Sequence, residues 1–459
     1  MTREDLTRKS QSELVDLVLA LVEQIAKQQA EIEALRLKLE QSKPPPTHSG
    51  NSSQPPSRDQ KGNLPPKRKK RKHGPPQGHV KYARKFVAHP DHLVEAKPKV
   101  CPHCQTDVSR AEMVLVAVNQ VTELPVARAE VIEVRQYAVA CPECGAGQEA
   151  EPPRGLEMQR AFGARLEATV VYYRQEQHMS YVRTQAAMRA LHGVEISEGG
   201  IDKIMQRAGA QALEAVKPIE QAIQTSAVIH SDETSSRVDG HTYWQWVFGS
   251  ARAILHIIRF NRSADVIQDL MGEREAEVWV CDCYGAQMKA PAKQHQLCLA
   301  HQLRNLQAVV ERLPKHFWAR HVQSLFRYAI HLHHQRQNLS VEVLTNRIVR
   351  LENCFDRLLN QPLEPPEARR LQRRYRKYRE ALFVFLYRTD VSPTNNVSER
   401  WLRPAVIHRK VSGGFRSDWG AKTYAALKSL TDTGALSGLS PFEVIQKLSG
   451  VPALPLGCE

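Results

Sequence analysis

The stretch VIHSDET at residues 228–234 decides the fold class of this chain, because a short run rich in β-branched residues leads into the carboxylate of Asp232. The stretch VWVCD at residues 278–282 repeats the pattern and ends in Asp282. Both runs are predicted to be buried strands, since β-branched and aromatic residues favour strands. A lone Asp after a strand is usually a turn or helix-capping residue, so neither signal is specific by itself.

A third carboxylate, Glu399, lies in the polar, helix-compatible segment NNVSER at residues 395–400. Three carboxylates on two strand ends and one helix can converge on a pair of divalent cations. Mg²⁺ takes oxygen ligands, and it can activate a water and stabilise the leaving oxygen of a phosphodiester. We therefore predict that Asp232, Asp282 and Glu399 are catalytic ligands of Mg²⁺ or Mn²⁺. Glu233 would point to the opposite side of an extended strand and ranks behind them.

The sequence around the first two acids predicts an α/β core of strands with one helix between them. Asp239-Gly240 marks a hairpin, because this pair tolerates positive φ, and Asp239 is therefore assigned to a turn. Ser263 is expected to cap the helix. The expected strands are 227–230, 242–248, 253–260 and 278–281, and the expected helix is 263–271.

Residues 299–388 are almost free of strand signals and rich in Leu, Arg, Gln and Glu, so we expect a helical insertion before the third acid. Cys298 and His301 open it as a Cys-x-x-His pair. Metal binding and packing at a helix start are both open for this pair, which stays outside the predicted catalytic set.

The formal charge of +15 over 459 residues is concentrated in two clusters, at residues 67–72 and 369–379. One charge run is often only a solvated face, but two dense clusters favour a polyanion, most simply nucleic acid. Near Glu399, further polar side chains could contact DNA phosphate or orient the acid. The predicted DNA-binding residues are Lys67, Arg68, Lys69, Lys70, Arg71, Lys72, Asn395, Asn396, Arg400, Arg403 and Lys410.

Four cysteines form two Cys-x-x-Cys pairs, Cys101 with Cys104 and Cys141 with Cys144. Two thiolates from each of two tight turns make a closed tetrahedral zinc site, which is a structural type of site. Redox-active thiols are the alternative. Metal binding suits a reducing cytosol better than disulfides do, and with no run of 18 apolar residues no membrane span is expected. We expect a cytoplasmic protein.

Residues 11–40 carry a heptad pattern, with Val18, Ile25 and Ile32 at one seam position and mostly Leu at the other. β-Branched residues at a with Leu at d favour a parallel two-stranded coiled coil. A helix packed on its own chain is the alternative. The Pro-rich basic segment that follows cannot bury enough apolar area to fold, so we expect a flexible tether and a homodimer or higher oligomer.

Residues 156–222 are predicted to be helical, and 180–210 resemble a helix, a Gly turn and a second helix. This pattern is compatible with a helix-turn-helix DNA reader or with a plain helical bundle. Asp202, Lys203 and Gln206 are candidates for DNA contact. The expected domains are a coiled coil (1–42), a basic linker (43–98), a zinc module (99–150), a helical DNA-binding region (151–223), a catalytic domain (224–430) and a C-terminal helix and tail (431–459).

The segment NNVSERWLRP at 395–404, followed by Arg409-Lys410 and GGF at 413–415, resembles the glutamate motif of the insertion-sequence-66 transposases. These are bacterial DDE transposases with an RNase H-like core. The chain also resembles that family in NSSQPPS at 51–57, in its paired Cys motifs, and in Gly420-Ala421 with Ser429-Leu430. The resemblance covers almost the full length, although TSS at 234–236 departs from the usual family wording.

The resemblance implies an RNase H-like catalytic core with a helical insertion, in which Asp232 bridges two metal ions that Asp282 and Glu399 complete. It implies a DNA transposase that hydrolyses the phosphodiester at element ends and joins the freed 3′-OH to target DNA, with accessory proteins of the same element as further partners. A zinc-containing DNA-binding regulator with an inactive core, or a structure-specific nuclease of the same fold, are the alternatives.

We predict one tightly held zinc ion per chain through Cys101, Cys104, Cys141 and Cys144. Thiolates bind Zn²⁺ at about 2.3 Å, and four of them close the site. Elemental analysis of freshly purified, reduced protein should give one equivalent of zinc. Reduced protein that is folded and free of zinc would contradict the prediction.

Overall fold

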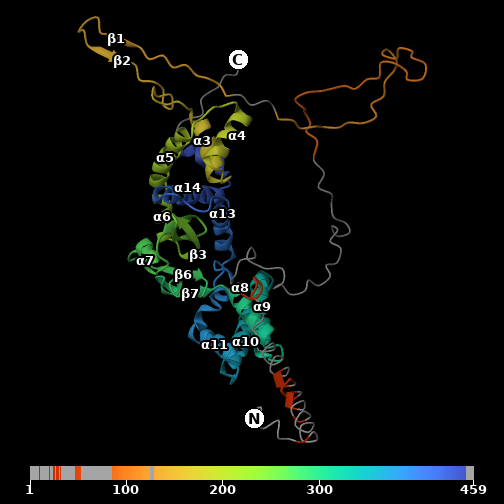
Figure 1. Ribbon diagram of the computed structural model, residues 1–459, viewed down its shortest axis with the longest axis vertical. Coiled ribbons are helices and arrows are strands. Elements are labelled where there is room, and N and C mark those ends of the chain that lie inside the picture. Colours follow the sequence, from red (N-terminus) through yellow and green to blue (C-terminus); the bar gives the residue numbers. More distant parts are fainter. Residues whose placement is uncertain are drawn as a thin grey trace. The chain divides into compact units, whose positions relative to one another are not determined.

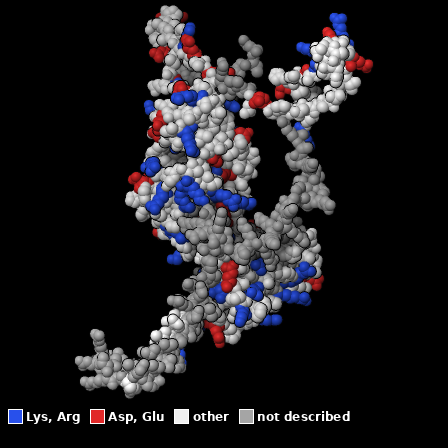
Figure 2. Space-filling model, turned by 45° about the vertical axis from the view of Figure 1, so that its right-hand side comes forward, with Lys and Arg blue, Asp and Glu red and all other residues white. Residues whose placement is uncertain are grey.

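The computed structural model describes residues 47–52, 85–124 and 129–450, together with positions 10, 20, 24, 25, 27–29, 31 and 32. Residues from these ranges fall into two compact units (Figure 1). The larger unit contains residues 1–65, 160–180 and 202–459, and the smaller one contains 66–159 and 181–201. The basic run at 67–72 lies outside the described residues. Figure 2 shows Lys and Arg side chains gathered in a band on one face of the molecule.

Of the predicted coiled-coil seam, the structure describes Ile25, Gln28 and Ile32, which are helical. Ile25 is 54% exposed and Ile32 is 49% exposed. Exposed apolar side chains at this spacing are typical of a helix that packs against a second helix in a coiled coil. Most of the heptad lies outside the described residues, so the coiled coil stays a prediction.

The smaller unit contains an antiparallel pair of short strands, β1 (Ala138–Ala140) and β2 (Gly147–Glu149), and the helix α4 (Tyr181–His192). Gly193, with φ +65°, ends α4 in the left-handed conformation that favours glycine. Helix α5 (Glu198–Ala215) begins in this unit and continues into the larger one. The helix, glycine turn and second helix expected at 180–210 are thus present, and no observation tests their contact with DNA.

The larger unit is built on a five-stranded sheet with the strand order β5-β4-β3-β6-β7. β3, β4 and β5 form an antiparallel meander, whereas β6 and β7 lie parallel to β3 and to each other. The strands are β3 (Val228–Val238), β4 (His241–Gly249), β5 (Ile254–Arg259), β6 (Ala276–Cys281) and β7 (Ala292–Leu297).

The predicted hairpin is confirmed, since Asp239 and Gly240 form the turn between β3 and β4 with φ of +47° and +74°. Two predictions near it are wrong. The first strand does not end at residue 230 but runs to Val238, because it pairs with β4 over that whole length. Ser263 does not cap helix α7 (Asp265–Met271), because Ala264 occupies the N-cap position and the Ser263 hydroxyl bonds to the Asp265 carboxylate.

Successive side chains of each strand point to opposite faces of the sheet, and both faces carry apolar residues. Ile229 of β3 and Trp279 of β6 belong to the face packed against α6 (Lys217–Gln224) and α7. The opposite face is covered by α13 (Asn396–Ser412) and α14 (Asp418–Leu436), which join the apolar clusters of Val247 and Val238. Helices α3 (Ala164–Gln175) and α15 (Pro441–Leu448) also belong to this unit.

Residues 299–388 are helical, as predicted, and enclose their own aromatic core. Phe326, Phe355, Tyr375 and Phe383 contact one another, with ring centroids 5.2 to 6.1 Å apart. The helices are α8 (Leu299–Arg312), α9 (Trp318–Gln335), α10 (Val341–Asn360), α11 (Pro366–Lys377) and α12 (Val384–Tyr387), and the short 3₁₀ turns of the unit are η3 (Gln287–Lys289), η4 (Arg336–Asn338) and η5 (Arg379–Ala381).

The two ends of this insertion are joined to each other. The Leu299 N–H donates to the Pro393 carbonyl at 3.0 Å, and the Asn395 N–H donates to Cys298 Sγ at 3.1 Å. The chain therefore leaves the sheet after β7 and returns to it before α13 at neighbouring points, although almost one hundred residues intervene.

Helix α13 reaches the sheet through a close contact between Trp401 and Gly249. A Cβ atom added to Gly249 would lie 2.0 Å from Cζ3 of the Trp401 ring, a separation that real atoms do not adopt. Only glycine at this position allows the ring to lie on the end of β4. The contact therefore sets how closely α13 approaches the sheet.

Gly249→Ala should lower the free energy of unfolding by about 1–3 kcal/mol, because the Trp401 ring and α13 must shift to admit the methyl group. Thermal unfolding followed by circular dichroism measures the change. Gly199→Ala is the control, since a Cβ at Gly199 meets open space. Equal melting temperatures for Gly249→Ala and the native chain would contradict this account of the contact.

Candidate active site

The register of the sheet aligns Asp232 with Asp282. In the parallel pair β3–β6, Val228 is opposite Val278 and His230 is opposite Val280. Two residues further along each strand direction come Asp232, which β3 still contains, and Asp282, which directly follows β6. Both acids therefore continue the side-chain alternation of the face that α13 covers.

Glu399 lies in the first turn of α13, and Asn395 positions the start of that helix. The Asn395 amide donates to the Ser231 carbonyl at 2.7 Å, and its Oδ1 lies 3.2 Å from His230 Nδ1. Ser398 Oγ donates to the same Oδ1 at 2.9 Å. The third predicted acid is thus held beside the strand that carries Asp232.

Electrostatics sets Asp232 apart from an ordinary surface carboxylate. Burial raises its pKa well above the usual value, and the negative charges of Glu233, Asp282 and Glu399 raise it further. The Glu233 N–H donates to Asp232 Oδ1 at 2.9 Å and opposes this shift only in part. Three neighbouring carboxylates that all disfavour ionisation of Asp232 make this a place where a cation would be stabilised.

Glu233 lies on the other face of the sheet, as predicted from strand alternation. Its side chain is buried, and Arg262 donates to Oε1 at 2.6 and 2.8 Å, while Gln287 donates to Oε2. Arg262 stacks on the rings of Trp244 and Tyr284, 4.4 and 3.9 Å from their centroids. Burial and the charge of Asp282 raise the pKa of Glu233, against the opposing effect of Arg262. This carboxylate already has a complete set of partners.

The carboxylate of Glu399 is engaged by α8. Arg304 Nη2 donates to Glu399 Oε1 at 3.1 Å, and His301 Nε2 lies 3.7 Å from the same oxygen. Across residues 47–52, 85–124 and 129–450, no three Cys, His, Asp or Glu side chains are grouped closely enough to hold an ion. Like charges repel when no cation lies between them, and the charge of Glu399 is balanced by its ion pair with Arg304.

The Cys298–His301 pair has a different role for each member. Cys298 is fully buried, accepts a hydrogen bond from the Asn395 N–H, and has a pKa raised to about 11 by burial. These features correspond to packing at a helix start. Burial and then the charge of Arg304 lower the pKa of His301, whereas Asp282 and Glu399 raise it, so His301 faces both acids. The sequence offered no signal for Arg304, because a lone Arg on a polar helix face is common.

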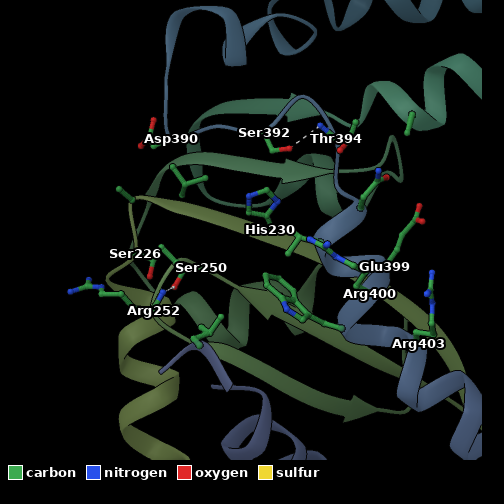
Figure 3. A pocket seen from close by; sticks show the side chains of 18 of the residues that line it. Ser226, His230, Ser250, Arg252, Asp390, Ser392, Thr394, Glu399, Arg400 and Arg403 are labelled. Carbon is green, nitrogen blue, oxygen red and sulfur yellow. Dashed lines mark hydrogen bonds between the residues drawn. The ribbon is translucent and has the colours of Figure 1, made fainter. Parts of the chain in front are cut away.

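A cavity of about 1130 Å³ opens beside Glu399 and takes in the first two turns of α13 (Figure 3). Its walls include Arg304 and Glu399 on one side and Arg252 of the β4–β5 turn on another. Arg400 and Arg403, which are exposed, also line it. An open hollow with several arginines beside carboxylates can take a phosphate backbone.

The other residues predicted for DNA contact divide by exposure. Asn396 is exposed and lines the cavity, and Lys410 is exposed near the end of α13. Asn395 is fully buried, so its amide cannot contact a phosphate, and of its two predicted roles only orientation of the acid is retained. In the cluster at 369–379, Arg376 bonds to the Leu359 carbonyl and Arg379 pairs with Asp356, so part of that charge is structural.

The two cysteine pairs occupy turns with the same hydrogen bonds. The Cys101 N–H donates to the Thr106 carbonyl and the Gln105 N–H to the Cys101 carbonyl, and Cys141 repeats both contacts with Ala146 and Gly145. A hydrogen bond from Thr106 lowers the pKa of Cys104 to about 7. Thiolate character at such turns fits zinc.

The described structure does not bring the four sulfurs together into one site. Large apolar side chains around the pairs are also exposed, for example Val116 and Val131 at 93% and 97%. Metal binding supplies folding free energy in small zinc modules. A module of this kind is expected to bury such residues only when an ion joins both turns, and the four-cysteine site stays a prediction.

Two family models match the chain. Residues 159–423 match the model described as Transposase IS66 family, and residues 98–145 match the zinc-finger binding domain of transposase IS66. No curated protein matches the sequence. No helix among the described residues is long and apolar enough to cross a membrane.

Asp232→Asn should raise the melting temperature of the metal-free protein at pH 7–8 by about 2–4 °C, the shift expected for about 1 kcal/mol. The raised pKa of Asp232 means that the folded state binds its proton more tightly than the unfolded chain does. The stability that this proton adds to the folded state is fully present below the unfolded pKa of about 3.9. It is lost as the pH rises through the pKa of Asp232 in the folded state. The uncharged amide of the Asp232→Asn variant should retain this stability at neutral pH.

The difference in melting temperature should shrink as the pH falls, because the native carboxyl becomes protonated. Asp239→Asn is the control, since Asp239 lies in an exposed turn at positive φ that asparagine also adopts. Scans in EDTA at several pH values supply the measurement. A lower melting temperature for Asp232→Asn at pH 7–8 would contradict the assignment.

Proposed function

The chain belongs to the IS66 family of transposases, and from this premise we propose that Asp232, Asp282 and Glu399 form a metal-dependent phosphodiester-cleaving site. The proposed reaction is hydrolysis at the ends of a bacterial insertion sequence, followed by attack of the freed 3′-OH on target DNA. The observation that carries the proposal is the register of β3 and β6, which aligns two acids on the face where α13 presents the third.

An RNase H-like core is supported by the topology of the sheet. A three-stranded antiparallel meander is extended, on the side of its first strand, by two strands parallel to that strand. This order places the first strand in the centre of the sheet. The central strand carries Asp232 and its parallel neighbour leads to Asp282, so the proposed ligands lie where a central strand and its neighbour meet.

The donor set suits magnesium, because carboxylate oxygens are the ligands that this ion prefers. Asp232, Asp282 and Glu399 would hold the ions, which when bound would activate a water and neutralise charge on the phosphate. Other residues of the protein position these carboxylates. Asn395 holds the start of α13 against β3, and Arg304 keeps the Glu399 carboxylate close to the site.

The cavity is lined by Glu399 but not by Asp232 or Asp282, and it would give the DNA backbone an approach to the site from the side of Glu399. Arg252, Arg400 and Arg403 supply positive charge along it. The basic run at 67–72 would add affinity that does not depend on sequence, and this part of binding should weaken with salt through counterion release. The zinc-binding module would organise a further DNA-binding surface, with a coiled-coil dimer and accessory proteins as the remaining proposed partners.

Asp232→Asn, Asp282→Asn and Glu399→Gln should each lower the rate of strand cleavage by at least about 10³-fold, because each removes a charged ligand while keeping side-chain shape. DNA affinity should change little, since it resides in basic residues. Cleavage is measured on linear DNA that carries the terminal repeats flanking the gene, with Mg²⁺. Binding is measured on the same DNA in EDTA.

Asp239→Asn and Glu380→Gln are the matched controls, because both acids are exposed and lie outside the site. Near-normal cleavage by any one of the three site variants would overturn the assignment of that acid. A second assay supplies a pre-cleaved end with a free 3′-OH and a supercoiled plasmid. Strand joining supports the transposase, whereas cleavage without joining identifies a nuclease of the same fold.

A further inference from the structure

Residues 47–52 form a short turn that packs on helix α8, about 260 residues further along the chain, and two of its side chains are buried there. His48 is 6% exposed and Asn51 is 5% exposed, although both are polar. Asn51 Nδ2 donates to Glu311 Oε2 at 2.6 Å, and His48 Nε2 lies 3.5 Å from the same oxygen. A single carboxylate near the end of α8 thus holds both buried side chains of the turn.

The turn is also internally bonded, so it presents one shape to α8. The His48 N–H donates to Asn51 Oδ1 at 2.9 Å, and the Gly50 N–H donates to His48 Nδ1 at 3.0 Å. The Asn51 N–H and Ser52 Oγ both donate to the His48 carbonyl. Asparagine at position 51 is needed twice, because its oxygen closes the turn while its amide nitrogen reaches Glu311.

The face of α8 that receives the turn also reaches the candidate active site. Glu311 accepts a hydrogen bond from Gln307 at 3.0 Å, and Arg304, one turn before Gln307, holds Glu399. Residues 304, 307 and 311 follow the i, i+3, i+7 spacing of one helix face. The contact with the turn and the contact with Glu399 therefore belong to one polar stripe.

We propose that the His48–Ser52 turn is a docking motif that binds the Glu311 end of this stripe and anchors the N-terminal segment to the catalytic domain. The occupant is the protein's own chain. Docking fixes the point from which the basic run at 67–72 extends, on the helix that also contacts Glu399. The fourteen residues between Ser52 and Lys67 can span at most roughly 50 Å, so the start of an anchored run lies within about that distance of the turn.

Hydrogen–deuterium exchange on the full-length protein tests the docking directly. The amides of residues 48–51 should be protected in the native chain, because three of them donate to groups within the turn. Glu311→Ala removes the acceptor and should accelerate their exchange by about tenfold or more. Glu311→Gln retains an oxygen acceptor and should keep most of the protection. Exchange along α8 should stay unchanged, since alanine is a good helix former.

Glu342→Ala is the control, because Glu342 is an exposed acid on α10. Unprotected amides at 48–51 in the native chain, or protection that survives Glu311→Ala, overturns the proposal. Protection that disappears on dilution assigns the turn to a second copy and overturns docking within one chain. Asn51→Ala should accelerate exchange at least as much as Glu311→Ala, because it removes both the bond to Glu311 and the Oδ1 acceptor of the His48 N–H.

A second experiment measures how much DNA the basic run at 67–72 can contact, and it rests on the proposed function. A photo-crosslinking residue in place of Lys69 should mark a narrow stretch of end DNA in the native chain and a wider stretch in Glu311→Ala. An equal width in both, with exchange accelerated, overturns the anchoring role. Loss of all crosslinks in both proteins contradicts DNA binding by the basic run and leaves the exchange result to decide the docking.

Discussion

The hydrogen bonds of Asn395 are the constraint on which the geometry of the larger unit depends. One buried amide side chain and its own backbone N–H join the first part of β3, the start of α8 and the start of α13. A buried amide that lacks these partners would be costly, and with them it admits only one arrangement of the three elements. Together with the Trp401–Gly249 contact, these bonds set the spacing between Glu399 and the strand acids.

The fold aligns the acids of the site, although their negative charges repel one another when no cation is bound. Carboxylates crowd around Asp232 and, together with burial, raise its pKa, while the ion pair between Glu399 and Arg304 balances one of the charges. Such a cluster destabilises the folded chain in the absence of a cation, which is the cost that proteins commonly carry at functional sites. A divalent ion held by the proposed ligands would relieve this repulsion.

Local chemistry made part of this structure predictable. The Asp239-Gly240 turn, the buried β-branched strands and the amphipathic insertion all follow from residues that act on their neighbours. Strand β7, AKQHQL, was missed because its polar residues carry no alternating pattern, and only pairing with β6 makes it a strand. The true length of β3 depends on β4 in the same way. Arg304 and the buried role of Asn395 depend on contacts between segments about one hundred residues apart, which no local pattern encodes.

The hydrogen bonds that join the two ends of the helical insertion affect which changes in its length the fold can accept. Its two ends bond to each other at Leu299–Pro393 and Cys298–Asn395, so the chain rejoins the sheet region beside the point where it left β7. The entropy of closing a loop grows only slowly with its length. The part of the insertion that lies away from the sheet could therefore change in length without moving the points at which the chain leaves and rejoins the sheet, whereas the part that packs on β6 and β7 could not.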